Sequence, residues 1–281
     1  MTKKFRLCAD DFGLSPLVNE GIIALVKQGR LNATSAMTTE PFCAKGSEDL
    51  LSAIASSQSD CELGLHFTLT EYSPLGELPK LAPDGLLPSV KWLLLKSHLR
   101  LLDVAEIEAE LTHQWDRFCE IFGRQPGYID GHQHIHLLPQ VRDVVLNFAT
   151  EQLDGGWVRN CHLPMSEVMK LGHDRFRASV ISILARSNAY GLDAHGLLAN
   201  ERFFGVNDFN RETAFGTLMD DWLTQAARFD GTSLIMCHPA MAGNQDMAIH
   251  DPIHQRRQDE FNYLKSDNFA ETLGLLGLAL Q

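Results

Sequence analysis

The sequence predicts an α/β protein built around a parallel β-sheet, which is either open or closed into a barrel. Short apolar segments typical of buried strands alternate with longer amphipathic segments typical of helices along the 281 residues. No change of composition, internal repeat or low-complexity segment interrupts this alternation, so we expect a single domain over residues 1–281. The length also suits one α/β barrel, which typically needs about 250 residues.

The composition limits the cellular compartment and the binding partners that we expect for this protein. Hydrophobic residues make up 44% of the chain, which is enough for a substantial core. With 24 Lys plus Arg against 36 Asp plus Glu, the net charge of −12 disfavours nucleic acid as the main partner, because an acidic protein repels phosphate groups. We find no signal peptide, no apolar run that could span a membrane and no Cys-x-x-Cys pair among the six cysteines. A reduced, cytoplasmic protein is therefore expected.

The first expected strand ends in two adjacent carboxylates. The apolar residues of 5–9 are followed by Asp10 and Asp11, and Ser15-Pro16 then begins a helix with a capping serine and a proline at the first helical position. This junction between strand and helix is where α/β proteins bind ligands. Two like charges so close destabilise each other unless a cation or a shared proton intervenes. The alternative is a solvated turn in which one aspartate caps the helix.

The later elements follow the same alternation. Proline and glycine at residues 73–89 indicate a long loop, the apolar and basic residues 92–102 indicate a helix, and residues 166–211 look irregular. The remaining expected strands are 31–39, 61–70, 127–139, 157–164 and 232–239, and the remaining expected helices are 15–29, 42–56, 103–122, 139–153, 212–229 and 267–280.

Polar residues gather at the ends of four expected strands. They are Asp10 with Asp11, His66, the segment 130–136 and His238. Because the carboxyl ends of parallel strands lie along one edge of a sheet, we expect these side chains to meet there. One carboxylate with two imidazoles is a ligand set for a catalytic divalent cation that keeps open positions.

Each of these residues also has a simpler explanation when taken alone. His66 could be a hydrogen-bonded strand histidine, and His238 could merely end a strand before Pro239. The histidines at 132, 134 and 136 share one face of an expected strand, so they cannot all be apolar packing and at least one should be functional. The joint occurrence at strand ends is what favours a site.

Four motifs in this order resemble the YdjC-like family, which includes chitooligosaccharide deacetylase and the hopanoid-biosynthesis-associated deacetylases. They are ADDFGLS at 9–15, GLHFTLT at 64–70, DGHQHIH at 130–136 and MCHP at 236–239. The resemblance covers nearly the whole chain and is weakest over 166–211. It implies a distorted (β/α) barrel like that of polysaccharide deacetylases, with the active site at the C-terminal rim of the strands. It also implies metal-dependent removal of an acetyl group from an N-acetylated sugar.

The resemblance also implies a role for individual residues. One divalent cation would be held by three ligands, namely Asp11, His66 and His132. Asp10 would be the general base, His238 would protonate the departing amine, and Arg159 would orient and ionise Asp10. Between the two metals considered, Zn and Mg, the imidazole ligands favour zinc or a neighbouring metal. The partner would be a small N-acetylated sugar, and a homodimer is compatible with the sequence.

Two other functions remain open at this point. A dinuclear hydrolase of the amidohydrolase or phosphoesterase kind would use the cluster His132, His134 and His136, whereas the deacetylase would leave His134 and His136 off the metal. A sugar- or metal-binding module with a decayed site is the non-enzymatic alternative. The sequence does not identify the substrate or the oligomeric state.

Overall fold

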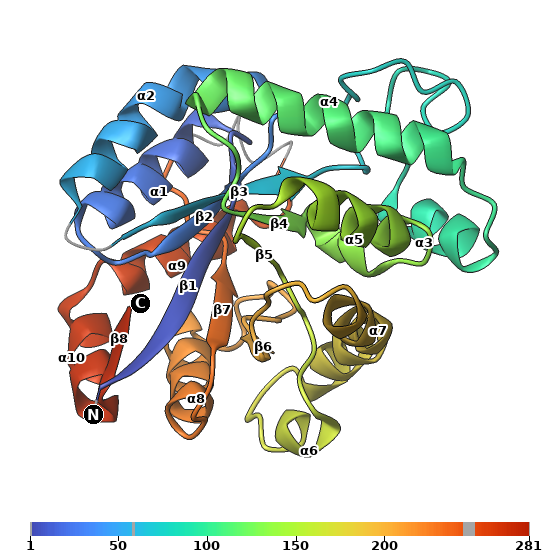
Figure 1. Cartoon of the computed structure of the whole chain (residues 1–281). Coiled ribbons are helices and arrows are strands. Elements are labelled where there is room, and N and C mark those ends of the chain that lie inside the picture. The colour runs from blue at the N-terminus through green and yellow to red at the C-terminus, as the bar shows by residue number, and fades with distance from the viewer. Residues whose placement is uncertain (1, 58–59, 244–250, 281) are drawn as a thin grey trace.

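A sheet of parallel strands lies at the centre of the computed structural model, which describes residues 2–57, 60–243 and 251–280, with helices around it (Figure 1). Hydrogen-bonded neighbours follow the order β5-β4-β3-β2-β1-β7-β6, and β8 pairs with β1, so the first and last strands lie side by side. The strands are β1 (Lys3–Phe12), β2 (Ala33–Ala36), β3 (Glu62–Phe67), β4 (Tyr128–Gly131), β5 (Trp157–Val158), β6 (Arg202–Phe204), β7 (Ser233–Cys237) and β8 (Leu278–Leu280).

The sheet curls until its two outer strands approach each other. β5 and β6 share no regular ladder, but a single parallel bridge joins Trp157 to Leu198, just before β6. The Asn200 side chain extends this contact, accepting from the backbone N–H of Asn160 (3.0 Å) and donating to its carbonyl (2.7 Å). Side-chain amides therefore replace part of the backbone pairing at this seam. The expected distorted barrel of parallel strands is confirmed.

The helices pack around this sheet and begin largely where the sequence indicates. Ser15 caps α1 by accepting from the N–H of Val18 (3.3 Å), and Asp103 caps α4 by accepting from the N–H of Glu106 (3.2 Å). None of the helices in the described ranges is long and apolar enough to cross a membrane. The helices are α1 (Pro16–Lys27), α2 (Pro41–Ser56), α3 (Val90–His98), α4 (Val104–Phe122), α5 (Val141–Gln152), α6 (Met165–Val168), α7 (Arg175–Ala194), α8 (Phe215–Ala227), α9 (His254–Leu264) and α10 (Asp267–Leu276), with the 3₁₀ helix η1 at His132–Leu137.

Several parts of the chain differ from the sequence prediction. The expected helix at 267–280 ends at Leu276, and Leu278–Leu280 form strand β8. Residues 166–211 are not irregular, since they contain α7 and β6. The α7 helix leaves apolar residues such as Phe176 and Ile183 exposed and begins without a side-chain cap, so neither its periodicity nor its start is marked. The α9 helix was not expected because Arg256, Arg257 and Glu260 occupy much of its buried face and leave only Phe261 and Leu264 as apolar buried residues.

Inside the sheet, a glycine makes room for an aromatic stack. The Tyr128 ring on β4 lies 4.0 Å from the Trp157 ring, and its hydroxyl lies 3.0 Å from the sulfur of Cys8. A Cβ atom added to Gly64 on the neighbouring β3 would come within 2.4 Å of the Tyr128 ring. This close approach explains why the position takes no side chain.

We therefore expect Gly64→Ala to destabilise the protein by about 1–3 kcal/mol, because the buried Tyr128 ring has to move. Urea unfolding measures this change. Gly274→Ala is the matched control, since a Cβ there meets nothing within 4 Å and alanine is the better helix former. A Gly64→Ala midpoint equal to that of Gly274→Ala would contradict the close packing.

Candidate metal centre

The site begins at an irregularity near the end of β1. The register between β1 and β2 shifts between Ala9 and Phe12, and Asp11 takes the left-handed conformation with φ 69°. Aspartate tolerates this conformation better than most residues because its short polar side chain can bond locally. The irregularity interrupts the alternation of side chains along the strand. As a result, Asp10 and Asp11 both line one cavity.

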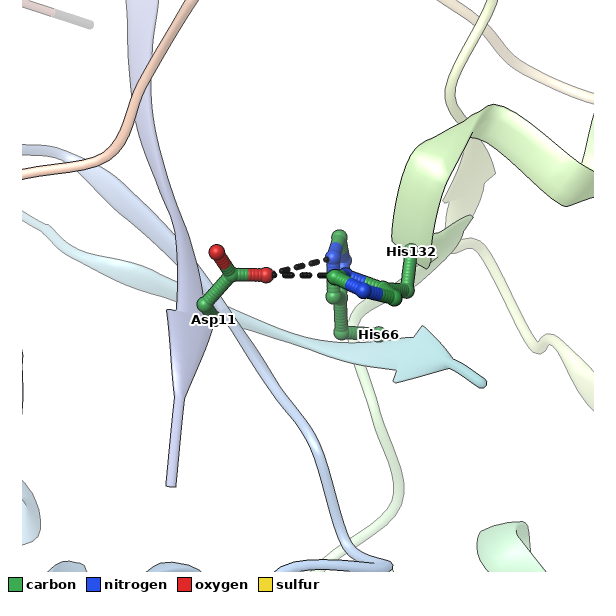
Figure 2. A group of neighbouring side chains, drawn as sticks. All are labelled: Asp11, His66 and His132. Carbon is green, nitrogen blue, oxygen red and sulfur yellow. Dashed lines mark hydrogen bonds and ion pairs between the residues drawn. The ribbon is translucent and has the colours of Figure 1, made fainter. Parts of the chain in front are cut away.

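Asp11, His66 and His132 converge in this cavity, as Figure 2 shows. Asp11 Oδ1 lies 3.2 Å from His66 Nε2 and 3.2 Å from His132 Nδ1. His66 comes from β3, and His132 directly follows β4, so two separate strand ends deliver the imidazoles. Asp11 and His66 are buried, and the His132 side chain is 12% exposed. The sheet thus brings together the three residues predicted to bind a cation.

The spacing of these donor atoms fits a divalent cation. Bonds from zinc to nitrogen or oxygen are about 2 Å long, which places the ligand atoms of a tetrahedral ion roughly 3.3 Å apart. The two measured separations of 3.2 Å agree with this value, and one atom from each residue lies within 4.8 Å of the others. A carboxylate with two imidazoles is also a chemically suitable set. These residues could therefore hold a metal ion.

A buried carboxylate fixes the orientation of His66. Its Nδ1 lies 2.6 Å from Asp130 Oδ1 and 3.0 Å from Ser35 Oγ, which leaves Nε2 to face Asp11. Such a partner on the far nitrogen is the usual support for a metal-binding histidine. Burial lowers the pKa of His66, but Asp130 and Asp11 outweigh it and raise that pKa to about 10.

Asp10 has a different partner. Arg159 donates to both of its oxygens, from Nη1 to Oδ2 (2.7 Å) and from Nη2 to Oδ1 (2.6 Å), and both side chains are buried. Burial raises the pKa of Asp10, but the Arg159 guanidinium overcomes this and holds the pKa well below its usual range. The pairing predicted for these two residues is present, and it keeps Asp10 ionised.

Arg159 also contacts a second group of potential metal ligands, which is formed by Cys8, Asp10 and Asp130. The Arg159 Nη2 atom lies 3.0 Å from the Cys8 sulfur and 2.5 Å from Asp130 Oδ2. A guanidinium therefore already supplies the positive charge among these three residues. Burial raises the pKa of the Cys8 thiol, which disfavours the thiolate that a metal would need.

His238, at the end of β7, lines the same cavity on the side of Asp10. Its Nε2 atom lies 3.9 Å from Asp10 Oδ2, and its backbone N–H donates to Glu260 Oε2 (2.5 Å). Burial lowers the pKa of His238 to about 4, although Asp11 and Asp10 oppose that change. The imidazole is therefore neutral at pH 7.

The expected strand at 127–139 is wrong beyond Gly131. Gln133 and His134 take left-handed conformations, with φ 51° and 58°, so the chain turns into η1 and the three histidines do not share a face. His134 lines the cavity, whereas His136 is buried with Nε2 3.2 Å from the carbonyl of Arg159. The dinuclear alternative used all three histidines, and of these His132 and His134 line the cavity whereas His136 does not.

Comparison with known proteins agrees with the sequence motifs. A sequence model of the family described as "YdjC-like protein" matches residues 4–274. The chain belongs to the YdjC-like family. It is similar to the chitooligosaccharide deacetylase of Escherichia fergusonii, with 38% identity over 144 residues, but the match spans only 51% of this chain and 54% of that protein.

A solved structure shares the fold of this YdjC-like chain. It comes from Enterococcus faecalis V583 and carries the provisional name cellobiose-phosphate cleavage protein. The TM-score is 0.78 with 21% sequence identity, and the alignment covers 100% of this chain and 97% of that one. At 21% sequence identity, this likeness shows a shared fold only.

The cavity of this family member is lined by both charged and apolar side chains. It has a volume of about 460 Å³. Its lining includes Asp10, Asp11 and the imidazoles, together with the apolar residues Phe176, Val180 and Phe209. Phe176 is 82% exposed although it borders the cavity. A ligand could therefore place a polar group against the aspartates and imidazoles and an apolar surface against the apolar side chains.

Sequence reasoning missed Arg257 as part of the site. Its Nη2 donates to Asp11 Oδ2 (2.7 Å), and the side chain is only 3% exposed. Burial and Arg257 act oppositely on Asp11: burial raises its pKa, whereas Arg257 and the hydrogen bonds of His132 and His66 bring it well below its usual range. No motif marks Arg257, because it lies on the unpredicted α9 helix.

Cation binding should release a proton from His66. Because the pKa of the metal-free His66 is about 10, its imidazole carries a proton at pH 6–8 that a cation must displace. Because one proton leaves His66 for each cation bound, this residue alone should make the cation affinity rise about tenfold per pH unit over that range. Titration calorimetry of Co²⁺ into the metal-free protein, in buffers of different ionisation enthalpy, counts the protons. Affinity independent of pH from 6 to 8 would contradict this assignment.

Proposed function

We propose that this protein is a metal-dependent carbohydrate N-deacetylase, which hydrolyses the acetamide of an N-acetylated sugar. The observation that carries the proposal is the placement of Asp11, His66 and His132 beside the arginine-bound Asp10 in one cavity. Hydrolysis of an amide needs a polarised carbonyl, a proton acceptor and a proton donor. The name of the Escherichia fergusonii relative supports a sugar amide as the substrate.

The cation and the carboxylate would divide the first half of the reaction. A divalent cation bound to the triad would polarise the acetyl carbonyl and lower the pKa of a water molecule towards roughly 7. Asp10 accepts the proton that the water loses as its oxygen bonds to the carbonyl carbon. Arg159 keeps Asp10 ionised and pointed into the cavity, which this step requires.

His238 would act in the second half of the reaction, in which the amine leaves. As the C–N bond breaks, the sugar nitrogen takes a proton from the imidazolium form of His238 and leaves as a free amine. Asp10 Oδ2 lies 3.9 Å from His238 Nε2, so the proton collected from water can reach the imidazole. A histidine with a pKa of about 4 is a strong acid once protonated, and it returns to its neutral form after the transfer.

The donor set also bears on the identity of the metal. Two imidazoles with one carboxylate suit zinc or a neighbouring first-row ion, whereas magnesium prefers oxygen ligands throughout. We propose zinc or such a neighbour rather than magnesium.

Acetate release from a panel of N-acetylated mono- and oligosaccharides tests the function. The metal-free protein should be inactive, and Zn²⁺ or Co²⁺ should restore acetate release from at least one member of the panel. A folded protein that binds one cation tightly and releases no acetate would instead favour the binding module. Binding of two cations would favour the dinuclear hydrolase.

Substitution of the two aspartates should separate their roles. Asp11→Asn replaces an anionic ligand with a neutral one, so the cation is held weakly and excess metal partly restores turnover. Asp10→Asn keeps all three ligands but loses the proton acceptor, so turnover falls by roughly 10² or more at unchanged metal content. Metal content and turnover of each purified variant are the measurements. A metal-free Asp10→Asn beside a metal-loaded Asp11→Asn would reverse the assignment.

A further inference from the structure

The α9 helix turns a charged face towards the site. Arg256, Arg257 and Glu260 are at most 3% exposed, although buried charges are costly unless they are paired. Arg257 reaches Asp11 at the end of β1, and Glu260, one turn further along, accepts the backbone N–H of His238 at the end of β7. One helix therefore holds two strand ends that carry residues of the proposed site.

The contact between Arg257 and Asp11 involves only one carboxylate oxygen. Arg257 Nη2 lies 2.7 Å from Asp11 Oδ2, whereas Oδ1 is the oxygen that faces His66 and His132, 3.2 Å from each. A carboxylate can bind a cation through one oxygen or through both. The guanidinium occupies one of the two and leaves the other for the cation.

Arg257 is itself held in place. Its Nε atom donates to Asp251 Oδ2 at 2.7 Å, so two carboxylates fix the plane of the guanidinium from different sides. A lysine could pair with one carboxylate but could not reproduce this forked contact. Asp11 also has a left-handed backbone, which persists only where the surroundings fix it. The Arg257 contact is one of the interactions that do so.

We propose that Arg257 is a positioning residue that restricts Asp11 to a single ligand oxygen, which keeps one coordination position of the cation free for water or substrate. This inference rests on the proposed metal-dependent function. It concerns a residue that lines the cavity and acts on the cation through the carboxylate of Asp11. Without Arg257, the freed Oδ2 could join Oδ1 on the cation as an additional ligand and crowd the position that water or substrate would take.

The coordination of Co²⁺ gives a readout that does not depend on activity. Four-coordinate Co²⁺ absorbs visible light more strongly than five- or six-coordinate Co²⁺, so the intensity reports whether a further ligand has joined. We would add Co²⁺ to the metal-free forms of the unaltered protein, Arg257→Gln and Arg257→Lys. Arg256→Gln is the matched control, because it removes the same charge from the same helix at a buried residue whose Nη2 donates to the carbonyl of Thr213.

The expected result is a weaker Co²⁺ absorption in Arg257→Gln and a kcat at least tenfold lower with a KM changed less than threefold. Arg257→Lys should recover part of both losses, and Arg256→Gln should keep the spectrum of the unaltered protein. A folded Arg257→Gln that no longer binds Co²⁺ would contradict the inference, because the freed carboxylate is expected to gain a contact with the cation and not to lose one.

Two further outcomes would also overturn the inference. One is an unchanged spectrum in Arg257→Gln, which would make the contact an ion pair of the fold alone. The other is an equal spectral change in Arg256→Gln, which would indicate a general loosening of α9. Failure of the unaltered protein to bind Co²⁺ would be a different result, because it would remove the proposed metal-dependent function itself.

Discussion

Two adjacent buried carboxylates, Asp10 and Asp11, are the constraint on which the rest of the site depends. Their repulsion is strong in a medium that water does not screen, and leaving either charge unpaired would cost roughly 3–5 kcal/mol. The protein gives each aspartate a separate set of partners. Arg159, beyond β5, neutralises Asp10, and Arg257 on α9 with the imidazoles of β3 and η1 surrounds Asp11. The site therefore requires segments from most of the length of the chain, and the curled sheet of parallel strands brings them together.

The same division of partners separates the chemistry of two residues that are neighbours in sequence. Enzymes commonly assign different roles to paired carboxylates through their surroundings. Asp10 makes a bidentate contact with a guanidinium, so it stays ionised and still has His238 at 3.9 Å as a route for a proton. Asp11 presents one oxygen to two imidazoles, which is the geometry of a ligand. The irregular backbone at Asp11 is what allows both to face one cavity.

Much of this could be predicted from the sequence, and the remainder has identifiable physical reasons. Parallel strands place their carboxyl ends on one edge, so the meeting of the four polar strand ends followed from locating the strands. The resemblance to the YdjC-like family then implied Asp11, His66 and His132 as the ligands among them. The turn at Gln133 and His134 could not be predicted, because left-handed conformations at residues other than glycine have no reliable signal. The α9 helix was missed for another reason. Helix prediction depends on an apolar stripe, and the buried face of α9 carries arginine and glutamate next to the candidate site, with only Phe261 and Leu264 as apolar residues.

The α7 and α9 helices, which the sequence did not predict, both contribute residues to the lining of the cavity. The chemistry of the cavity explains why they were difficult to predict. A site that has to fix buried charges needs polar residues where a structural helix would have leucines, and α9 supplies them. A site that has to accept a ligand needs apolar residues left uncovered where a structural helix would bury them, and α7 does this with Phe176 and Val180. The buried polar residues of α9 and the exposed apolar residues of α7 both weaken the amphipathic pattern by which a helix is predicted. The reason is the same in both helices, because these residues serve the site and not the packing of the helix. Two helices beside one cavity thus bury charged residues or expose apolar ones. This pattern marks the cavity as a candidate functional site independently of any motif.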